Sequence, residues 1–384
     1  MLRLATLIVV PTLLLAGCGG ESEPEAGATP TAEPSSPSPS SPSPSSPATS
    51  DSANATPASP SPRSGRPEVI GTVAKGLEVP WGIAFLPDGT ALVTERDSGR
   101  VYQVGRGKVD QVGRIEEAQP GGEAGLLGVA VSPSYDRDRR VFFYATAASD
   151  NRVLRTTFEN GRLGRMQPIL TDIPKASNHD GGRMVFGPDG LLYVSTGEAG
   201  QPDLAQDRDS LGGKILRITQ DGEPGPGNPD RGSPIWTWGH RNVQGLAFDD
   251  NGNLWASEFG QNTFDELNLI EKGRNYGWPM VEGKGDEPGL QDPQVTWSTE
   301  DASPSGLAFV GGRLWLGALR GERLWRVEVN GRRATDEKGF FVGEYGRVRT
   351  VVPAPDGNLW VTTSNRDGRG DPADQDDRIL LVRP

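Results

Sequence analysis

The residues best suited to acid–base chemistry in this sequence are its two histidines, His179 and His240. An imidazole titrates near neutral pH, so it can accept a proton from an alcohol. A pair of glycines follows His179 closely, where backbone can approach a ligand, and we expect this histidine to be catalytic. His240 is one residue out of phase with Arg241 and should point the other way, which indicates a structural role.

Other common catalytic sites are poorly supported. Two histidines and one cysteine, Cys18, are too few for a zinc site with the usual nitrogen and sulfur ligands. No serine stands in a nucleophile turn, so a Ser-His-Asp hydrolase is not indicated. Hydrolysis by this chemistry is therefore not predicted.

The elements that must position His179 form a repeat. In six stretches, an apolar strand is followed, usually after a turn that contains glycine, by a second strand, and repeats every ~40–60 residues are typical of a propeller. We therefore predict an all-β fold, a six-bladed β-propeller with four-stranded antiparallel blades. The first stretches are residues 82–89, 127–133, 183–190, 245–248, 306–309 and 351–357, and the second strands are 91–94, 141–144, 192–195, 254–257, 314–317 and 359–362.

The first strand of each propeller blade lines the central channel, so residues at one repeat position meet at the axis. At or near that position lie a carboxylate, an imidazole, an amide and three guanidiniums. Apart from the amide, which lies next to one guanidinium, we expect these groups to face one pocket. They belong to Glu123, His179, Arg241, Asn242, Arg347 and Arg349.

The overall charge makes this group of arginines a local exception. The formal net charge of the chain is -12. Such an acidic surface repels nucleic acid and offers no basic footprint, so we predict no nucleic-acid partner. A positive pocket in a negative protein suits a small polyanionic ligand.

The sequence divides into three segments. Residues 1–18 combine Arg3, an apolar stretch and small residues before Cys18, and they resemble a bacterial lipoprotein signal whose cysteine is lipidated; an ordinary signal peptide is the alternative. Residues 19–66 are rich in Ser and Pro and predict a disordered tether. Residues 67–384 would form the propeller. We expect an exported protein that is held at the bacterial cell envelope only through its lipid anchor.

Two acidic segments are candidates for calcium, which takes carboxylate and carbonyl oxygens. One is residues 258–266, with residues 275–279, Glu282 and Asp286 further on. The other is the run of residues 367–377. A solvated polar loop is the alternative for the first segment.

Six motifs in order resemble the soluble quinoprotein sugar dehydrogenases, the glucose/sorbosone dehydrogenase family with its aldose sugar dehydrogenases. The resemblance covers about residues 79–382 and implies a six-bladed propeller that binds pyrroloquinoline quinone (PQQ) and Ca²⁺. The motifs are residues 122–128, 178–183, 211–215, 239–242, 265–270 and 275–279.

The resemblance also implies catalytic roles. His179 would be the general base, while hydride passes to the quinone. Arg241 and Asn242 would hold the reactive face of the quinone. Glu123 and Glu198 match positions that meet the sugar or steady the histidine.

The resemblance implies cofactor and metal ligands as well. Arg347 and Arg349, alternate residues of one strand, match a pair that clamps cofactor carboxylates, and Arg320 stands where the best-known glucose oxidisers have lysine. Two departures from the family are Gln261 and Val243, which stand in place of prolines. The carbonyls of Gly260 and Gln261 match ligands of the cofactor's calcium, and a second calcium site matches Glu266, Asp286 and the carbonyls of Tyr276 and Glu282.

The predicted function is oxidation of aldose sugars at the anomeric carbon to lactones, with electrons passed to an external acceptor. One alternative is a sugar-binding propeller without redox chemistry. Another is a calcium-dependent sugar lactonase, in which carboxylates rather than arginines should dominate the channel.

Overall fold

The computed structural model describes residues 65–105 and 107–384. The predicted signal segment with Cys18, and the predicted tether apart from Gly65 and Arg66, lie outside these residues. Within the described part of the chain, no helix is both long and apolar enough to cross a membrane.

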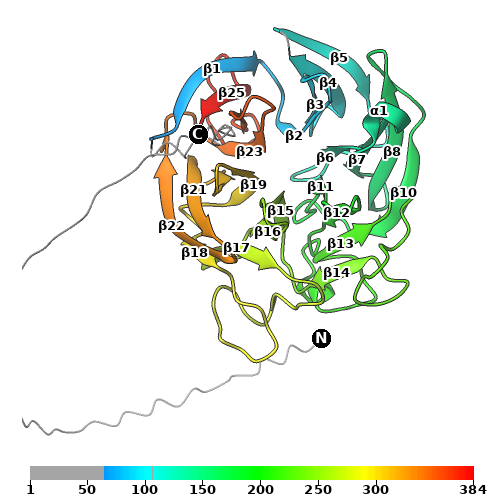
Figure 1. The fold of residues 1–384 in the computed structure, drawn as a ribbon, viewed down its shortest axis with the longest axis vertical. Helices are drawn as coiled ribbons and strands as arrows, with labels where there is room; N and C mark the ends of the chain where they lie inside the picture. The colour runs from blue at the N-terminus through cyan, green and yellow to red at the C-terminus, as the bar shows by residue number, and fades with distance from the viewer. Residues whose placement is uncertain (1–64, 106) are drawn as a thin grey trace, which may run out of the picture. The chain divides into compact units, whose positions relative to one another are not determined.

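Six antiparallel sheets surround a central axis, as Figure 1 shows, and this confirms the predicted six-bladed propeller. The first blade contains β2 (Pro80–Phe85), β3 (Ala91–Glu95), β4 (Arg100–Gly105) and β5 (Lys108–Arg114). The second contains β6 (Leu126–Val131), β7 (Arg140–Thr146), β8 (Asn151–Glu159) and β10 (Gln167–Ile173), and the short β9 (Arg162–Leu163) pairs with β8. The third contains β11 (Met184–Phe186), β12 (Leu192–Ser195), β13 (Lys214–Ile218) and β14 (Ile235–Trp238).

The remaining blades follow the same order from the axis outward. The fourth contains β15 (Val243–Phe248), β16 (Leu254–Glu258), β17 (Phe264–Ile270) and β18 (Val295–Ser298), and the fifth contains β19 (Pro304–Val310), β20 (Arg313–Ala318), β21 (Arg323–Asn330) and β22 (Arg333–Phe340). The sixth contains β23 (Val348–Pro353), β24 (Leu359–Thr363), β25 (Arg378–Arg383) and β1 (Glu68–Lys75). The helical elements of the described residues are one turn each, α1 (Tyr135–Asp138) and η1 (Pro202–Ala205).

The ring closes through the sixth blade, because its outermost strand comes from the other end of the described chain. β1 pairs antiparallel with β25, from Glu68 opposite Arg383 to Lys75 opposite Arg378. Figure 1 shows the two strands side by side. The pairing satisfies backbone groups that an open ring would leave at an unpaired edge.

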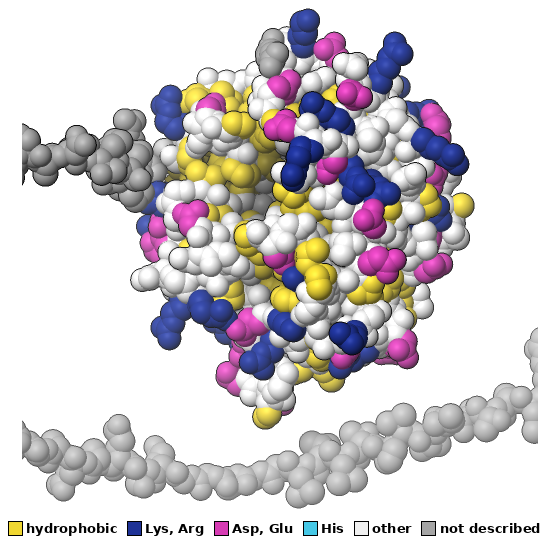
Figure 2. Space-filling model, turned by 45° about the vertical axis from the view of Figure 1, so that its right-hand side comes forward, with side chains coloured by type: hydrophobic (Ala, Val, Ile, Leu, Met, Phe, Trp, Pro, Cys, Tyr) yellow, Lys and Arg dark blue, Asp and Glu magenta, His cyan; other side chains and the backbone are white. Residues whose placement is uncertain are grey.

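The predicted first strands are the inner strands of all six blades. Their C-terminal halves together line one apolar cavity of about 360 Å³ at the axis, which shows that the six strands converge there. On the face in Figure 2, hydrophobic side chains surround a central hollow, and acidic and basic side chains are interspersed around it.

The core lies between neighbouring blades. The aromatic residues of the second strands are buried, and several contact an inner strand of the next blade. Tyr193 packs edge-on against Phe248 at 5.2 Å between ring centroids, and Trp360 packs against Phe85 at 4.7 Å. Trp255 is fully buried, and its indole N–H donates to Asp249 at 3.0 Å.

Replacing Trp255 with alanine should remove a large part of the packing between the fourth and fifth blades. We expect Trp255→Ala to lower the free energy of unfolding by about 3–5 kcal/mol, because it leaves a cavity and removes one of the hydrogen bonds to the carboxylate of Asp249. Met280→Ala, at a side chain that is 61% exposed, is the control and should change it by about 0.5 kcal/mol or less. Urea unfolding followed by far-ultraviolet circular dichroism measures both, and equal effects would contradict the packing role.

Candidate active site

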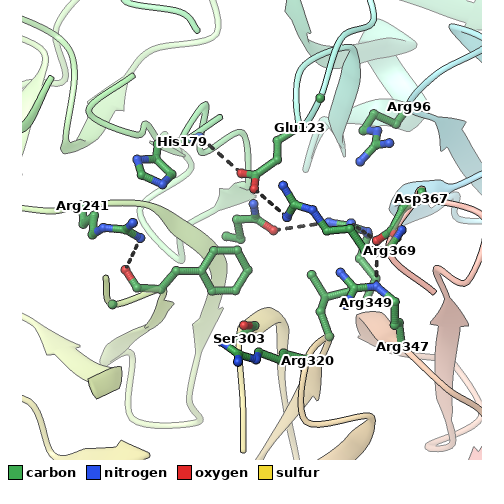
Figure 3. A pocket seen from close by; sticks show the side chains of 16 residues that line it. Arg96, Glu123, His179, Arg241, Ser303, Arg320, Arg347, Arg349, Asp367 and Arg369 are labelled. Carbon is green, nitrogen blue, oxygen red and sulfur yellow. Dashed lines mark hydrogen bonds and ion pairs between the residues drawn. The ribbon is translucent and has the colours of Figure 1, made fainter. Parts of the chain in front are cut away.

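A polar cavity of about 580 Å³ lies where the chain enters the inner strands. Six arginines, His179 and only two carboxylates line it, together with smaller and apolar residues. Figure 3 shows His179 and Arg241 on one wall, Arg347 and Arg349 on the opposite wall and Glu123 between them. The lining residues are Arg96, Gly122, Glu123, His179, Arg241, Gln244, Phe259, Gly260, Ser303, Leu319, Arg320, Arg347, Arg349, Asp367, Gly368 and Arg369.

His179 is held firmly in the loop before β11. Its backbone has φ 60, a left-handed conformation that costs energy in a residue other than glycine and is often found at functional sites. Its ring Nδ1 lies 2.5 Å from Oε1 of Glu198, which is almost fully buried. With Nδ1–H donating to that carboxylate, Nε2 of His179 is the ring nitrogen that accepts a proton.

Glu123 holds the same histidine from the other side. Its Oε2 accepts the backbone N–H of His179 at 3.2 Å, and its Oε1 accepts a hydrogen bond from Arg369 at 3.1 Å. Burial pushes the pKa of Glu123 upward, but the charge of Arg369 and the His179 N–H outweigh it, so the pKa lies below its usual value. Glu123 is therefore an anion at neutral pH.

Arg241 reaches the cavity from the loop before β15. Its Nη1 donates to the carbonyl of Phe259 at 3.3 Å, whereas its buried Nε has no hydrogen-bond partner among the described residues. The next residue, Asn242, is buried behind the cavity wall. Its Oδ1 accepts the N–H of Gly181 at 3.0 Å, and its Nδ2 has no hydrogen-bond partner within the part of the chain that the structure describes. His240 points away from the cavity and bonds to Glu258, as its sequence phase predicts.

The opposite wall carries the arginine pair. Arg347 stands just before β23 and Arg349 lies within it, and both point to the carboxylate of Asp367, with Nε of Arg347 3.0 Å and Nη2 of Arg349 3.3 Å from Oδ2. Burial, with the charge of Arg96, lowers the pKa of Arg349 to about 10. Two buried guanidiniums share one carboxylate, which leaves this wall positive.

Arg183 closes the channel beneath the cavity. Its guanidinium donates to the carbonyl of Gln244 at 2.8 Å and to Oγ1 of Thr350 at 3.2 Å, and it stacks on Trp81 with 4.2 Å to the ring centroid. These partners come from the fourth, sixth and first blades. Arg183 also lines the apolar cavity, so it separates the apolar cavity from the polar one.

Of the residues predicted as calcium ligands, Gly260 and Gln261 lie in the loop between β16 and β17, and Glu266 lies in β17. Tyr276, Glu282 and Asp286 lie in the loop between β17 and β18. Gly260 lines the polar cavity, but Gln261, Glu266, Tyr276, Glu282 and Asp286 do not. Oε1 of Glu282 accepts the N–H groups of residues 261–264 at 2.8–3.1 Å. Glu266 accepts hydrogen bonds from Gly283 and Asn268. In the described residues, no group of three or more acidic, histidine or cysteine side chains is arranged for a metal.

Residues 77–381 match the model of the family described as Glucose / Sorbosone dehydrogenase. The chain belongs to this family. The family resemblance predicted from the motifs is thus confirmed, and the chain is an oxidoreductase that acts on sugars.

Individual relatives agree with this family assignment. The aldose sugar dehydrogenase of Escherichia coli is 33% identical over 76% of the chain and 89% of the relative. A PQQ-bound aldose sugar dehydrogenase from Streptomyces coelicolor is 52% identical, with a TM-score of 0.82 over 84% of this chain and 99% of that one. A glucose dehydrogenase-like protein from Thermus thermophilus is 43% identical, with a TM-score of 0.77 over 83% and 99%.

The convergence predicted from the repeat is confirmed for Glu123, His179, Arg241, Arg347 and Arg349, and Arg320 also lines the cavity. Arg320 is half-exposed and donates to Glu300 at 2.6 Å. Glu198 and Asn242 lie behind the wall and act on it only through the residues that they bond.

One structural expectation was wrong. The glycines that follow His179 do not line the cavity; they pack against neighbouring backbone and side chains instead. A Cβ on Gly181 would lie 2.6 Å from backbone atoms of Thr196, and one on Gly182 would lie 2.7 Å from Leu127. These glycines let the loop pack closely, and they do not open it to a ligand.

Sequence reasoning missed five polar lining residues: Arg96, Gln244, Ser303, Asp367 and Arg369. Gln244 could have been found, because it is a polar residue inside an apolar inner strand. Asp367 belongs to the acidic run considered for calcium, but its carboxylate pairs with the two arginines instead. Ser303 follows no pattern that we recognise.

Gly197 sets the position of His179, because a Cβ there would lie 1.9 Å from the histidine's carbonyl oxygen. We expect Gly197→Ala to displace this loop and to lower the free energy of unfolding by about 1–3 kcal/mol. Gly71→Ala is the matched control, since a Cβ there meets nothing within 4 Å. Thermal unfolding of the two variants tests this, and an unchanged midpoint in Gly197→Ala would contradict the close contact.

Proposed function

We propose that this enzyme oxidises aldose sugars at the anomeric carbon to lactones, with PQQ and Ca²⁺ as cofactors and an external electron acceptor. The observation that carries the proposal is the arrangement of one cavity: a carboxylate-bound imidazole on one wall and a pair of buried guanidiniums on the other. A titratable base and an anion clamp across a sugar-sized cavity suit this reaction.

The residues present fit PQQ, which has three carboxylates. Arg347 and Arg349 would hold carboxylates on the clamp wall, and half-exposed Arg320 lines the same cavity. Arg241, whose buried Nε has no hydrogen-bond partner among the described residues, would face the reactive end of PQQ, with Asn242 behind it. When bound, PQQ supplies the two-electron acceptor for the hydride of the anomeric carbon. The PQQ bound in the Streptomyces relative supports this assignment.

His179 would be the general base of the reaction. Its Nε2 would take the proton of the anomeric hydroxyl, while Nδ1–H keeps its hydrogen bond to Glu198. The imidazolium that results would be stabilised by the buried carboxylate of Glu198, as in other carboxylate–histidine pairs. Glu123, on the substrate side of His179, would accept a hydrogen bond from a sugar hydroxyl.

For calcium, the ligands we propose are the carbonyls of Gly260 and Gln261 at the cavity and a second set around Glu266. Burial and the charges of Glu258 and Glu282 raise the pKa of Glu266 to about 8. Carboxyl groups buried near one another favour a cation between them. The second set would comprise Glu266, Asp286 and the carbonyls of Tyr276 and Glu282.

Two further parts of the proposal rest on the sequence. Export and lipid anchoring would depend on Cys18, which lies outside the described residues.

A lactonase is less well supported, because arginines and not carboxylates dominate the lining of the cavity.

Reconstitution tests the function directly. Purified protein incubated with PQQ and Ca²⁺ should reduce a redox dye when an aldose is added, and a panel of aldoses gives its specificity. Activity should require both PQQ and the sugar. Lactone formation from sugar without dye reduction, or no turnover with any aldose, would contradict the proposal.

Single variants should separate binding from chemistry. We expect Arg347→Ala or Arg349→Ala to raise the Kd for PQQ by about tenfold to a hundredfold, because each leaves a buried carboxylate less well paired. His179→Ala should lower kcat by about 10²–10⁴-fold with PQQ still bound. Absorbance titration with PQQ and dye reduction measure the two quantities.

The matched control for these variants is Arg333→Ala on the outer strand β22, where the arginine is exposed and far from the lining residues. It should change neither quantity. If the arginine-pair variants titrate with PQQ as the unmodified protein does, the clamp assignment is wrong.

A further inference from the structure

Arg369 is the most exposed charged group at the cavity, and neither the repeat nor the motifs pointed to it. It belongs to the loop of residues 364–377 between β24 and β25. Its side chain is 61% exposed, whereas that of its partner Glu123 is 17% exposed. In Figure 3 its guanidinium reaches from the clamp side of the cavity to Glu123.

The loop that carries Arg369 is tied down by buried carboxylates. Asp376 accepts hydrogen bonds from Asn365 and Ala373 at 2.9 Å each, and Asp377 accepts the N–H of Asn365 at 2.6 Å. The N–H of Arg369 itself donates to Asp367 at 3.0 Å. The backbone of Arg369 is therefore held in place, at a position from which its side chain reaches Glu123.

A continuous set of contacts links the clamp wall to the base. Asp367 pairs with Arg347 and Arg349 and anchors the backbone of Arg369. The Arg369 guanidinium holds Oε1 of Glu123, whose Oε2 holds the backbone N–H of His179. Among the described residues, Glu123 is the one recorded side-chain partner of Arg369, so this contact accounts for its position.

We infer that Arg369 is a positioning residue, which fixes the carboxylate of Glu123 as an anion and through it the backbone of His179. This inference rests on the proposed function for its role in sugar oxidation. The arginine of this ion pair is mostly exposed, so the pair adds little to stability, about 0–1 kcal/mol for pairs at the surface. Its effect falls on Glu123, which lines the cavity together with His179.

Other charges act on Glu123 as well. Arg369 is the largest favourable influence on its ionised form, and the backbone N–H and ring of His179 follow. Three further groups interact with it more weakly: Asp180, whose pKa burial raises to about 6, and the guanidiniums of Arg241 and Arg349. Loss of Arg369 should therefore raise the pKa of Glu123.

Histidine-selective ¹⁵N labelling gives a direct readout, because the chain contains two histidines. The amide proton of His179 donates to Glu123 and should shift when Glu123 is protonated, while that of His240 serves as an internal reference. Glu123→Gln gives the signal expected beside an uncharged partner. In Arg369→Gln, the midpoint of this shift should rise by about half a pH unit or more, and Arg369→Lys should restore part of it.

Arg320→Gln is the matched control for the titration, since Arg320 lines the same cavity but pairs with Glu300. It should leave the midpoint in place. If Arg369→Gln does not move the midpoint, or Arg320→Gln moves it equally, Arg369 does not fix Glu123 and the inference is wrong. Thermal midpoints close to that of the unmodified protein should show that the variants are folded.

The rate of sugar oxidation provides a second test of the inference. With an aldose that the enzyme oxidises, Arg369→Gln should lower kcat/KM by about tenfold, with a Kd for PQQ within about twofold of the original, and Arg369→Lys should recover most of the loss. Unchanged kcat/KM would refute a role in the reaction. If the unmodified protein oxidises no aldose, the proposed function fails, and the amide titration still decides whether Arg369 positions the base.

Discussion

The structure depends on closure of the ring, in which β1 pairs with β25 to complete the sixth blade. Closure fixes the direction of all six inner strands, so their first residues meet at one end of the channel. Polar groups gather at that end and apolar groups at the other. The site thus joins residues that lie far apart in the chain, and no single blade contains it.

The charge of the site follows from the same geometry. Guanidiniums from several blades face one another across the cavity. Arg96, Arg320 and Arg369 each pair with a separate carboxylate, whereas the buried Arg347 and Arg349 share that of Asp367, so the charge of this pair is only partly compensated. Burial lowers the pKa of Arg183 to about 9, and the nearby charge of Arg349 adds to this effect. Such an excess of buried positive charge costs energy in the empty protein, and a polyanionic ligand offsets that cost.

The sequence was sufficient to predict the fold and the main groups of the site, because both depend on the repeat. His179, Arg347 and Arg349 stand at fixed places relative to the inner strands, so the phase of the repeat located them. Glu198 was found only through family resemblance. Its role depends on a 2.5 Å contact between its carboxylate and Nδ1 of His179, and the sequence repeat does not predict that contact. Neither the repeat nor the family resemblance identified Arg369, because its position depends on a loop shaped by buried carboxylates.

Arg183 has a consequence for traffic through the molecule. Its side chain spans the axis and bonds to backbone and side-chain groups of other blades, so the propeller has no through-passage at that level. In the proposed reaction, sugar and product would therefore share one entrance on the polar side. The oxidised product would then have to leave before the next sugar could enter, so turnover would depend on how fast the product clears this entrance.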